Sequence, residues 1–476
     1  MRFRQLTRLI AVAAVAVPVQ AVLAPVAFAA PSVYKVTSNS ADAGVSGSLP
    51  WAVAQANAHP GFDYIRLPQI DITLSSTLVV TDPVSIDTTV VGEHFGSPGM
   101  SYSVIGAVIR GSAGAPDLIR LEESASGSNI DGLTLLDFTG TAIDVKANSS
   151  WMQYNQIGYT ASVDTGSLVF TMASPITLGS VGIALHGFAN SVRGNGIAGV
   201  GTGISVESSF NSISINSIGA EYRPAMCCQP PEYLPIGTIH ESFDGIRLSG
   251  AAQVNWVTAN RIRYAGRAGV WMDGPGVGGN VLFSNEIVRN QLGAVAVGGA
   301  NGNSIGMSVQ SPNIFYENPG GGIILGWQGF GSADNNFVVN NTIGLQYAGR
   351  PFSEYSARAN DQYLGIAVIG SRGNSITGNL IAGMQFHGIA LIGSTANEVS
   401  GNSIGGGPLL DQTYSGYTGI SPNGGYGVLV QDSPRNWIGP NNFSRINAAG
   451  KPKDYRKANT LGNVGVFGAS PGNVRR

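Results

Sequence analysis

Cysteine is nearly absent from this chain. Its two cysteines, Cys227 and Cys228, stand side by side among 476 residues, so they cannot form a disulfide framework. They form a strained vicinal disulfide, an intermolecular bridge or a pair of structural thiols. A zinc site needs further ligands at suitable spacing, and the sequence around the pair offers none. We therefore expect no metal site and no cofactor.

Charge is also scarce, since charged residues make up only 11% of the chain. The 26 basic and 28 acidic residues give a formal net charge of −2, and the basic residues form no patch. A nucleic-acid-binding surface needs such a basic patch, so we expect no nucleic-acid partner. The composition instead suits a surface made mainly of Asn, Ser, Thr and Gly.

Long apolar runs are limited to the start of the chain. Residues 1–29 read as a secretory signal peptide, with three arginines, an apolar stretch over 10–23 and small residues at a cleavage site over 27–29. No later segment reaches the length of a membrane-spanning helix. We expect an exported protein, periplasmic or extracellular, with no membrane span. The sequence leaves its oligomeric state open.

Asparagine and glycine, by contrast, are abundant, and asparagine is periodic. One spacing occurs eight times: Asn, an apolar residue two positions on, Asn five positions on, and an apolar residue seven positions on. The copies begin at Asn190, Asn211, Asn255, Asn280, Asn336, Asn374, Asn397 and Asn436. Between copies stands a Gly-Ile/Val-x-apolar element. Uninterrupted copies recur after 21, 25 or 23 residues, which is typical of a stacked-repeat architecture.

Each repeat contains short runs in which β-branched and polar residues alternate, which indicates strands. One repeat cannot bury its own apolar face, whereas a coil of stacked repeats can. Asn at the corners is expected to form hydrogen-bonded ladders and to adopt the left-handed backbone of a sharp turn. The inner positions that we expect to stack are Ile183, Ile204, Ile246, Ile366 and Ile389.

This repeat resembles that of the right-handed parallel β-helix superfamily, the pectin-lyase-like fold. The superfamily includes pectin lyases, polygalacturonases, alginate epimerases and surface adhesins. The resemblance implies an all-β fold, a single-stranded right-handed parallel β-helix over residues 62–468, followed by a C-terminal tail at 469–476. Residues 30–61 resemble the N-terminal cap of bacterial members, with a short helix near 48–57 that Ser48 caps.

The catalytic motifs of these relatives are missing. The chain has no Asp-Pro-His-Asp run as in alginate epimerases, no paired Asp with Gly-His-Gly as in polygalacturonases, and no Arg-x-Pro-x-x-Arg as in pectate lyases. The resemblance therefore transfers no active site.

Five long insertions each follow the sequence motif Asn-x-Ile-Gly. They cover residues 159–180, 220–243, 307–320, 345–363 and 408–426. Because insertions at one point of a repeat emerge along one edge of a solenoid, we expect them to build walls beside one strand face. They contain ten of the 16 tyrosines. These tyrosines either contact sugar rings or pack the loops onto the coil.

The outward positions of Gly-Ile-x-Leu place Arg247 beside Trp271 on successive coils. This pair suits an acidic sugar, because Arg247 can bind the sugar carboxylate and Trp271 can stack on the sugar ring. The substrate-binding candidates are Arg247, Trp271, Tyr222, Tyr233, Tyr347 and Tyr355. The catalytic candidates are His240, Glu241 and Asp244, which precede Arg247 closely. The alternative is a loop end held by ordinary ion pairs. His186 and His387 are interpreted as corner residues.

Two functions remain open from the sequence. In one, the protein binds an extracellular or envelope polysaccharide in a groove walled by the loops. The sequence leaves open whether it also cleaves this ligand, and an enzyme of this kind would be a polysaccharide lyase or a glycoside hydrolase. In the other, it is a non-catalytic surface adhesin or envelope scaffold. The partner expected in the first case is a polysaccharide or surface glycan.

Overall fold

The computed structural model describes residues 30–88, 106–164, 167–172, 177–219, 244–344, 362–405, 423–443, 445–446, 452–453, 459 and 461–475. The side chains of 161–178 are outside this description. The expected signal peptide and the two cysteines also lie outside the described residues.

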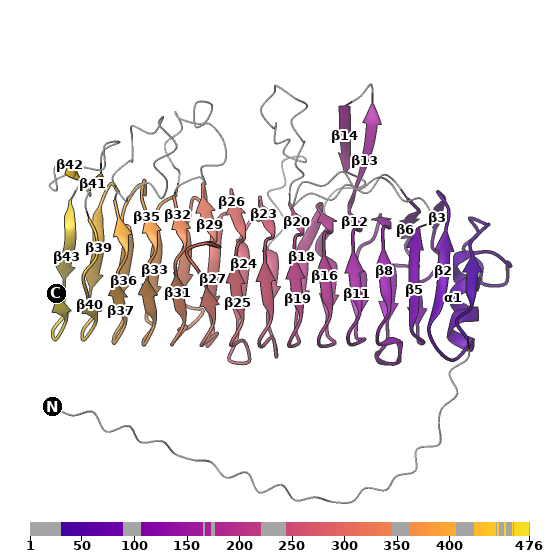
Figure 1. Ribbon diagram of the computed structural model, residues 1–476, viewed down its shortest axis with the longest axis horizontal. Coiled ribbons are helices and arrows are strands. Elements are labelled where there is room, and N and C mark those ends of the chain that lie inside the picture. Colours follow the sequence, from indigo (N-terminus) through magenta and orange to yellow (C-terminus); the bar gives the residue numbers. More distant parts are fainter. Residues whose placement is uncertain are drawn as a thin grey trace, which may run out of the picture.

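Three long parallel sheets run along a rod, and each coil contributes one strand to each sheet (Figure 1). The 15-stranded sheet contains, in order, β1 (Val33–Lys35), β2 (Asp63–Leu67), β5 (Val84–Thr88), β8 (Asn129–Asp131), β11 (Trp151–Gln153), β16 (Ser191–Arg193), β19 (Ser212–Ser214), β22 (Trp256–Thr258), β25 (Val281–Phe283), β28 (Ser304–Ile305), β31 (Phe337–Val339), β34 (Ser375–Thr377), β37 (Glu398–Ser400), β40 (Trp437–Ile438) and β44 (Val474–Arg475).

The 13-stranded sheet contains β4 (Leu78–Val80), β7 (Ile119–Leu121), β10 (Thr141–Val145), β15 (Thr177–Leu185), β18 (Val200–Val206), β21 (Asp244–Leu248), β24 (Ala268–Asp273), β27 (Leu292–Val297), β30 (Ile323–Leu325), β33 (Ile366–Ile369), β36 (Ile389–Ile392), β39 (Tyr426–Gln431) and β43 (Gly462–Phe467).

The 12-stranded sheet contains β3 (Asp71–Thr73), β6 (Val108–Arg110), β9 (Thr134–Leu136), β12 (Gln156–Ile157), β17 (Gly196–Ile197), β20 (Ser217–Ile218), β23 (Arg261–Arg263), β26 (Glu286–Val288), β29 (Ile314–Tyr316), β32 (Thr342–Ile343), β35 (Leu380–Ile381) and β38 (Ser403–Ile404). Two antiparallel hairpins, β13 (Tyr159–Asp164) with β14 (Ser167–Met172) and β41 (Arg445–Ile446) with β42 (Pro452–Lys453), and the 3₁₀ turn η1 (Glu123–Ala125) complete the described elements.

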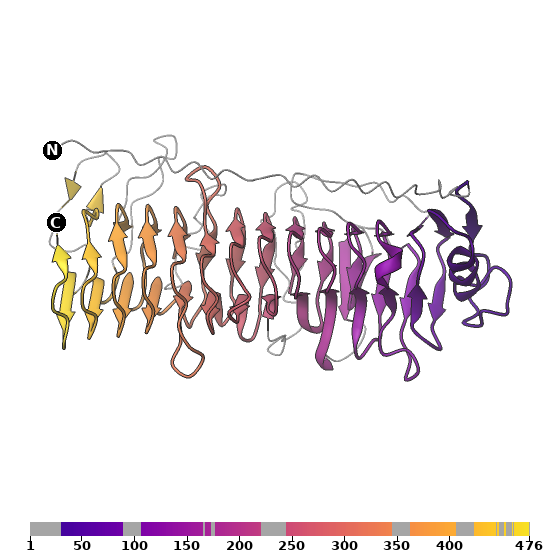
Figure 2. The ribbon, with the colours of Figure 1, turned by 90° about the horizontal axis from the view of Figure 1, so that it is seen from below.

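The chain passes repeatedly from the 15-stranded to the 12-stranded to the 13-stranded sheet, and all strands within these sheets are parallel. Such crossovers are right-handed because a twisted strand packs back onto its sheet only with that hand. The fold is a single-stranded right-handed parallel β-helix, which confirms the prediction. Figure 2 shows the coils side by side along the rod axis.

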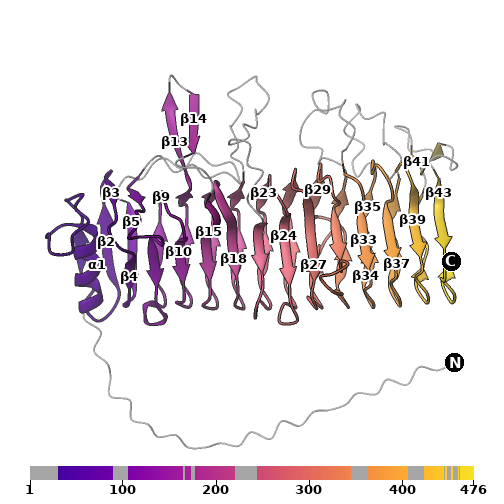
Figure 3. The same ribbon diagram turned by 180° about the vertical axis from the view of Figure 1, so that it is seen from behind.

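The helix α1 (Leu49–Ala58) closes the N-terminal end of the rod (Figure 3). The Ser48 hydroxyl accepts a hydrogen bond from the Trp51 amide at 3.1 Å, and Pro50 occupies the first turn, as the sequence predicts. β1 pairs with β2, and β44 pairs with β40. Strand pairing therefore extends into both segments expected to flank the β-helix, 30–61 and 469–476.

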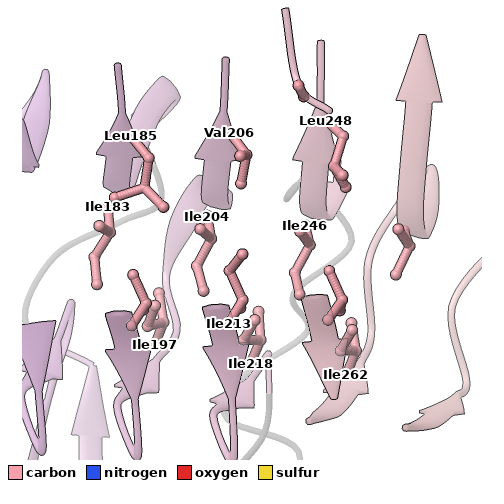
Figure 4. Close-up of a cluster of buried hydrophobic side chains, with 14 of the residues drawn as sticks. Ile183, Leu185, Ile197, Ile204, Val206, Ile213, Ile218, Ile246, Leu248 and Ile262 are labelled. Carbon is pink, nitrogen blue, oxygen red and sulfur yellow. The ribbon is translucent and has the colours of Figure 1, made fainter. Parts of the chain in front are cut away.

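The interior is a continuous stack of aliphatic side chains, and Figure 4 shows Ile183, Ile204 and Ile246 aligned on successive coils. Ile366 pairs with Ile389 farther along the same sheet. All five predicted inner isoleucines are 0% exposed, which confirms the assignment of inside and outside. Alternation of residue type fixes this register, since a slip by one residue would turn every inner side chain outward.

Two asparagine ladders run along the corners beside the 15-stranded sheet. The Asn255 amide donates to the Asn280 side-chain oxygen at 2.9 Å, and Asn260 donates likewise to Asn285 at 3.0 Å. The predicted ladders are thus present. The left-handed backbone, however, belongs to the residue before most ladder asparagines, for example Val254 with φ 54°. The ladder asparagines themselves do not adopt this conformation, whereas Asn335 and Asn340, each of which precedes a ladder asparagine, do.

Four of the five insertion points share one corner. β12, β20, β32 and β38 belong to the 12-stranded sheet, and from each the chain next enters the 13-stranded sheet. β28, which contains the third Asn-x-Ile-Gly, belongs to the 15-stranded sheet. The third insertion therefore begins at a different corner, and its expected placement is wrong. The motif Asn-x-Ile-Gly occurs on both asparagine ladders. The motif alone therefore does not determine from which corner an insertion emerges.

Within the part of the chain that the structure describes, no helix is long and apolar enough to cross a membrane.

Candidate functional site

Arg247, Trp271 and Asp244, the predicted site residues that the structure describes, belong to neighbouring strands of the 13-stranded sheet. Arg247 of β21 pairs in register with Ser205 on one side and with Trp271 on the other, so the predicted neighbours are on adjacent coils. Val295 follows Trp271 in this column, a position that the sequence analysis omitted. Residues on either side of each of these positions belong to the rod interior, so the column itself faces outward.

Asp244 is held in a two-pronged ion pair. Its side chain is 1% exposed, and one carboxylate oxygen accepts a hydrogen bond from Arg267 Nε at 2.9 Å while the other contacts the terminal nitrogen of the same guanidinium. Burial raises the pKa of Asp244, although Arg267 opposes that shift. This geometry corresponds to the ion-pair alternative. His240 and Glu241, the other catalytic candidates, lie outside the described residues.

Trp271 faces away from the rod interior and is nevertheless only 2% exposed. The Arg267 guanidinium carbon lies 3.9 Å from the centre of the indole ring, and Phe330 packs edge-on at 5.6 Å. The ring belongs to a second apolar cluster, outside the coil, with Ala268, Leu292, Val295, Val297, Ile324 and Ala367. The expectation of an open ring face for a sugar is not met, because outward orientation on a sheet does not prevent cover from neighbouring segments.

Arg247 is one of the cations on this face. Its side chain is half-buried, and its Nε is buried without a hydrogen-bond partner. Among the described residues, Arg247 forms no ion pair, whereas the neighbouring Arg267 is bound to Asp244. A guanidinium without a carboxylate partner attracts anions, so an anionic ligand that reaches the accessible part of this side chain gains a charge-assisted interaction.

A histidine between two carboxylates lies on the same face, toward the N-terminal end. His186 Nδ1 is 3.2 Å from Glu207, and its Nε2 is 3.4 Å from Asp144. Asp144 in turn accepts a hydrogen bond from Arg120 Nε at 2.9 Å. The imidazole is 41% exposed and Asp144 is only 13% exposed, so solvent reaches the ring. The Asp144 oxygen that faces the ring is buried and makes no hydrogen bond with the described residues.

From the sequence alone, His186 is interpreted as a corner residue. The available signal is its position directly after Gly-Ile-x-Leu, which stacks His186 on Glu207 of the next coil. A histidine side chain can act as a general acid or base. Among the described residues, no group of three His, Cys, Asp or Glu side chains has the arrangement of a metal site.

The second corner histidine behaves as expected. His387 Nδ1 accepts a hydrogen bond from the Tyr426 amide at 2.9 Å, and the two rings are stacked at 5.9 Å. Burial lowers the pKa of His387.

The four tyrosines named as ligand contacts, Tyr222, Tyr233, Tyr347 and Tyr355, lie outside the described residues. Described tyrosines of the insertions contact side chains of the coil, although Tyr363 remains 44% exposed. Tyr159 is 3% exposed, the Tyr316 hydroxyl is 3.2 Å from a Glu286 carboxylate oxygen, and Tyr363 stacks on Phe386 at 4.2 Å. For these residues the structure agrees with the packing alternative.

A family model described as NosD, periplasmic copper-binding protein, matches residues 306–463, about a third of the chain. No curated protein matches the sequence. Among solved structures, the chain is similar to the A-module of mannuronan C-5 epimerase AlgE6 of Azotobacter vinelandii, with 14% identity, 93% of this chain and 99% of that chain covered, and a TM-score of 0.45.

It is also similar to the catalytic domain of a GH87 α-1,3-glucanase in complex with tetrasaccharides, with 12% identity, 90% and 67% of the two chains covered and a TM-score of 0.46. The Dettilon tailspike protein has 12% identity, coverage of 91% and 68%, and a TM-score of 0.39. These likenesses are too distant to carry an argument about the activity of this chain.

Proposed function

We propose that this protein is exported and binds an acidic polysaccharide on the outer face of its 13-stranded sheet. The observation that carries this proposal is Arg247, a half-buried cation that forms no ion pair with the described residues. A sugar carboxylate that reaches the accessible part of its side chain would supply the compensating charge. The predicted signal peptide and the periplasmic description of the matched family support export.

The bound chain would pass from Arg247 toward His186. Glu207 precedes Arg247 by one coil on the same face, because Val206 pairs with Leu248. The His186 imidazole, which lies between Asp144 and Glu207, would then be available for proton transfer to or from a sugar. Asp244 would position Arg267 and Trp271. His240, Glu241 and the four tyrosines stay in this proposal as rim residues.

The matched family description names copper, and the matched residues do not fit such a site. Residues 306–463 contain no Cys, one His and two Met. His387 already accepts a hydrogen bond at Nδ1, and Met384 is 2% exposed with its sulfur near the Gln362 amide. Copper sites use accessible imidazole, thiolate or thioether groups. No step of the proposed function involves copper.

The test compares Arg247→Ala with Arg372→Ala, in which a mostly exposed arginine is removed from another part of the rod. Binding of alginate and polygalacturonate is measured by calorimetry. Arg247→Ala should weaken binding by roughly 1.5–3 kcal/mol, the value of a hydrogen bond to a charged group, and Arg372→Ala should leave it unchanged. Equal binding by both variants and the parent would refute the site.

Turnover is tested with His186→Gln. If the protein cleaves its ligand, this variant should lose the release of unsaturated or reducing ends and keep its affinity. The adhesin or scaffold alternative is favoured if the parent binds these polysaccharides without any product, or binds none of them.

A further inference from the structure

An evenly spaced row of aromatic side chains lies on the outer face of the 15-stranded sheet. It consists of Trp151, Trp256, Phe337 and Trp437, which we call the aromatic row. Their exposed fractions are 48%, 44%, 49% and 37%. Each is the first residue of its strand, in β11, β22, β31 and β40. Exposure of four large rings at one position of a repeat needs an explanation, because single apolar residues normally scatter over a surface.

The spacing of the row follows from strand register. Between Trp151 and Trp256 the same position is held by Ser191 and then Ser212. The next interval passes through Val281 and Ser304, and the last through Ser375 and Glu398. Every interval is thus three coils, or about 14 Å at the usual distance between strands. The same step backward from Trp151, through Asn129 and Ser85, reaches the half-buried Tyr64.

The fold itself does not need these rings. The residue after each ring, such as Met152 or Val257, is at most 3% exposed and supplies the core, so the ring points away from the interior. Serine holds the same position on four other coils: Ser191, Ser212, Ser304 and Ser375. Trp256 is braced by an edge-to-face contact with Phe283 at 5.9 Å, which orients the indole in advance of binding.

The arrangement suits a repeating polymer better than a protein. The core of a protein interface is a continuous apolar patch, whereas four of the six positions between these rings are serines. An aromatic face stacks on the apolar face of a pyranose, and the serine hydroxyls between rings can bond sugar hydroxyls. Glu398 is the one charged residue at this position between Trp151 and Trp437. The near absence of charge along the aromatic row therefore favours an uncharged ligand.

We propose that the aromatic row binds one linear, uncharged polysaccharide chain that lies parallel to the rod axis. Each interval spans a few linked sugars, so the same face of the polymer meets a ring at regular steps. This site is on a different sheet from Arg247 and uses different residues. It goes beyond the proposed function and is tested separately from it.

The test uses Trp256→Ser, Trp437→Ser and the double variant, each of which places at the site the residue native to neighbouring coils. Affinity electrophoresis in hydroxyethylcellulose and in glucomannan should show binding weakened at least fivefold in each single variant and nearly lost in the double variant. Phe467→Ser is the control, since Phe467 is 47% exposed on the 13-stranded sheet. It should bind like the parent, as should Arg247→Ala.

Chain length gives a second readout. Cello-oligosaccharides too short to span one interval can meet only one ring, while longer ones meet two and should bind many times more tightly because the second contact is intramolecular. Trp256→Ser should reduce that gain. The proposal is overturned if the parent binds no neutral polymer, if the serine variants bind like the parent, or if affinity is independent of length.

It is also overturned if sedimentation shows a dimer that Trp256→Ser dissociates, since the row would then be a contact between copies of the chain. If Arg247→Ala loses alginate binding but still binds neutral polymers, the proposal for the aromatic row stands. Such a result bears only on the site proposed on the 13-stranded sheet.

Discussion

The guanidinium of Arg267 lies 3.9 Å from the centre of the Trp271 ring, and it covers an indole that belongs to an apolar cluster outside the coil. Sequence position alone predicts that replacing Trp271 leaves the stability of the fold unchanged, because its side chain points outward. The cover by Arg267 and Phe330 implies the opposite.

We therefore expect Trp271→Ala to lower the free energy of unfolding by roughly 3–5 kcal/mol, as for a large aromatic in a packed core. Trp256→Ser, which removes the same residue type from an exposed position, should cost under about 1 kcal/mol. Chemical denaturation of the two variants measures the contrast. Equal losses would show that the outer cluster adds no stability.

Glu286 makes stability depend on acidity. Burial alone would raise the pKa of its carboxyl, but the guanidiniums of Arg263 and Arg261 outweigh burial and lower the pKa to about 2. A carboxyl whose pKa is lower in the folded than in the unfolded state stabilises the fold above its unfolded pKa of about 4.5. This contribution, roughly 2–3 kcal/mol, is lost as the pH falls from about 5 toward 2.

Denaturation of Glu286→Gln at several pH values tests this linkage. The variant should be less stable than the parent at pH 7, and the difference should shrink toward pH 2. Glu123→Gln, at an exposed carboxyl in η1, is the control. A difference that stays constant with pH would contradict the linkage.

Val254 has a left-handed backbone, which costs a β-branched residue roughly 1–2 kcal/mol. Asn adopts this conformation with less strain, so Val254→Asn should raise the free energy of unfolding by about 1 kcal/mol. Val281→Asn, on the regular strand β25, should lower it. The melting temperatures of both variants provide the measurement, and a loss of stability in Val254→Asn would mean that packing outweighs strain there.

Asn260 occupies the middle of a ladder. Its side-chain oxygen accepts from the Asn216 amide at 2.9 Å, and its own amide donates to the Ile213 carbonyl at 2.9 Å and to Asn285 at 3.0 Å. Asn260→Ala leaves these buried groups without partners and should cost roughly 3 kcal/mol or more. Asn473→Ala, at the half-buried end of the other ladder, should cost clearly less. A similar loss at both positions would argue against stacking along the ladder.

The sequence by itself determined the coil. A period of 21–25 residues, alternation around Ile183, Ile204 and Ile246, and paired asparagines predicted the parallel β-helix, its inner face and its ladders. These features are local and repeat in every coil, so each copy confirms the same register. The sequence also placed Arg247 beside Trp271, because register alone makes neighbours of equivalent positions.

Only the tertiary structure decided what surrounds those positions. The burial of Trp271, the pairing of Asp244 with Arg267, and the carboxylates on both sides of His186 depend on side chains from other coils and from segments outside the repeat. The spacing of Trp151 and Trp256 shows why. They are 105 positions apart in the sequence, with irregular insertions between them, and become three coils apart only when the sheet aligns them. Local pattern specifies which face a residue occupies, and long-range packing determines whether that face is open, covered or charged.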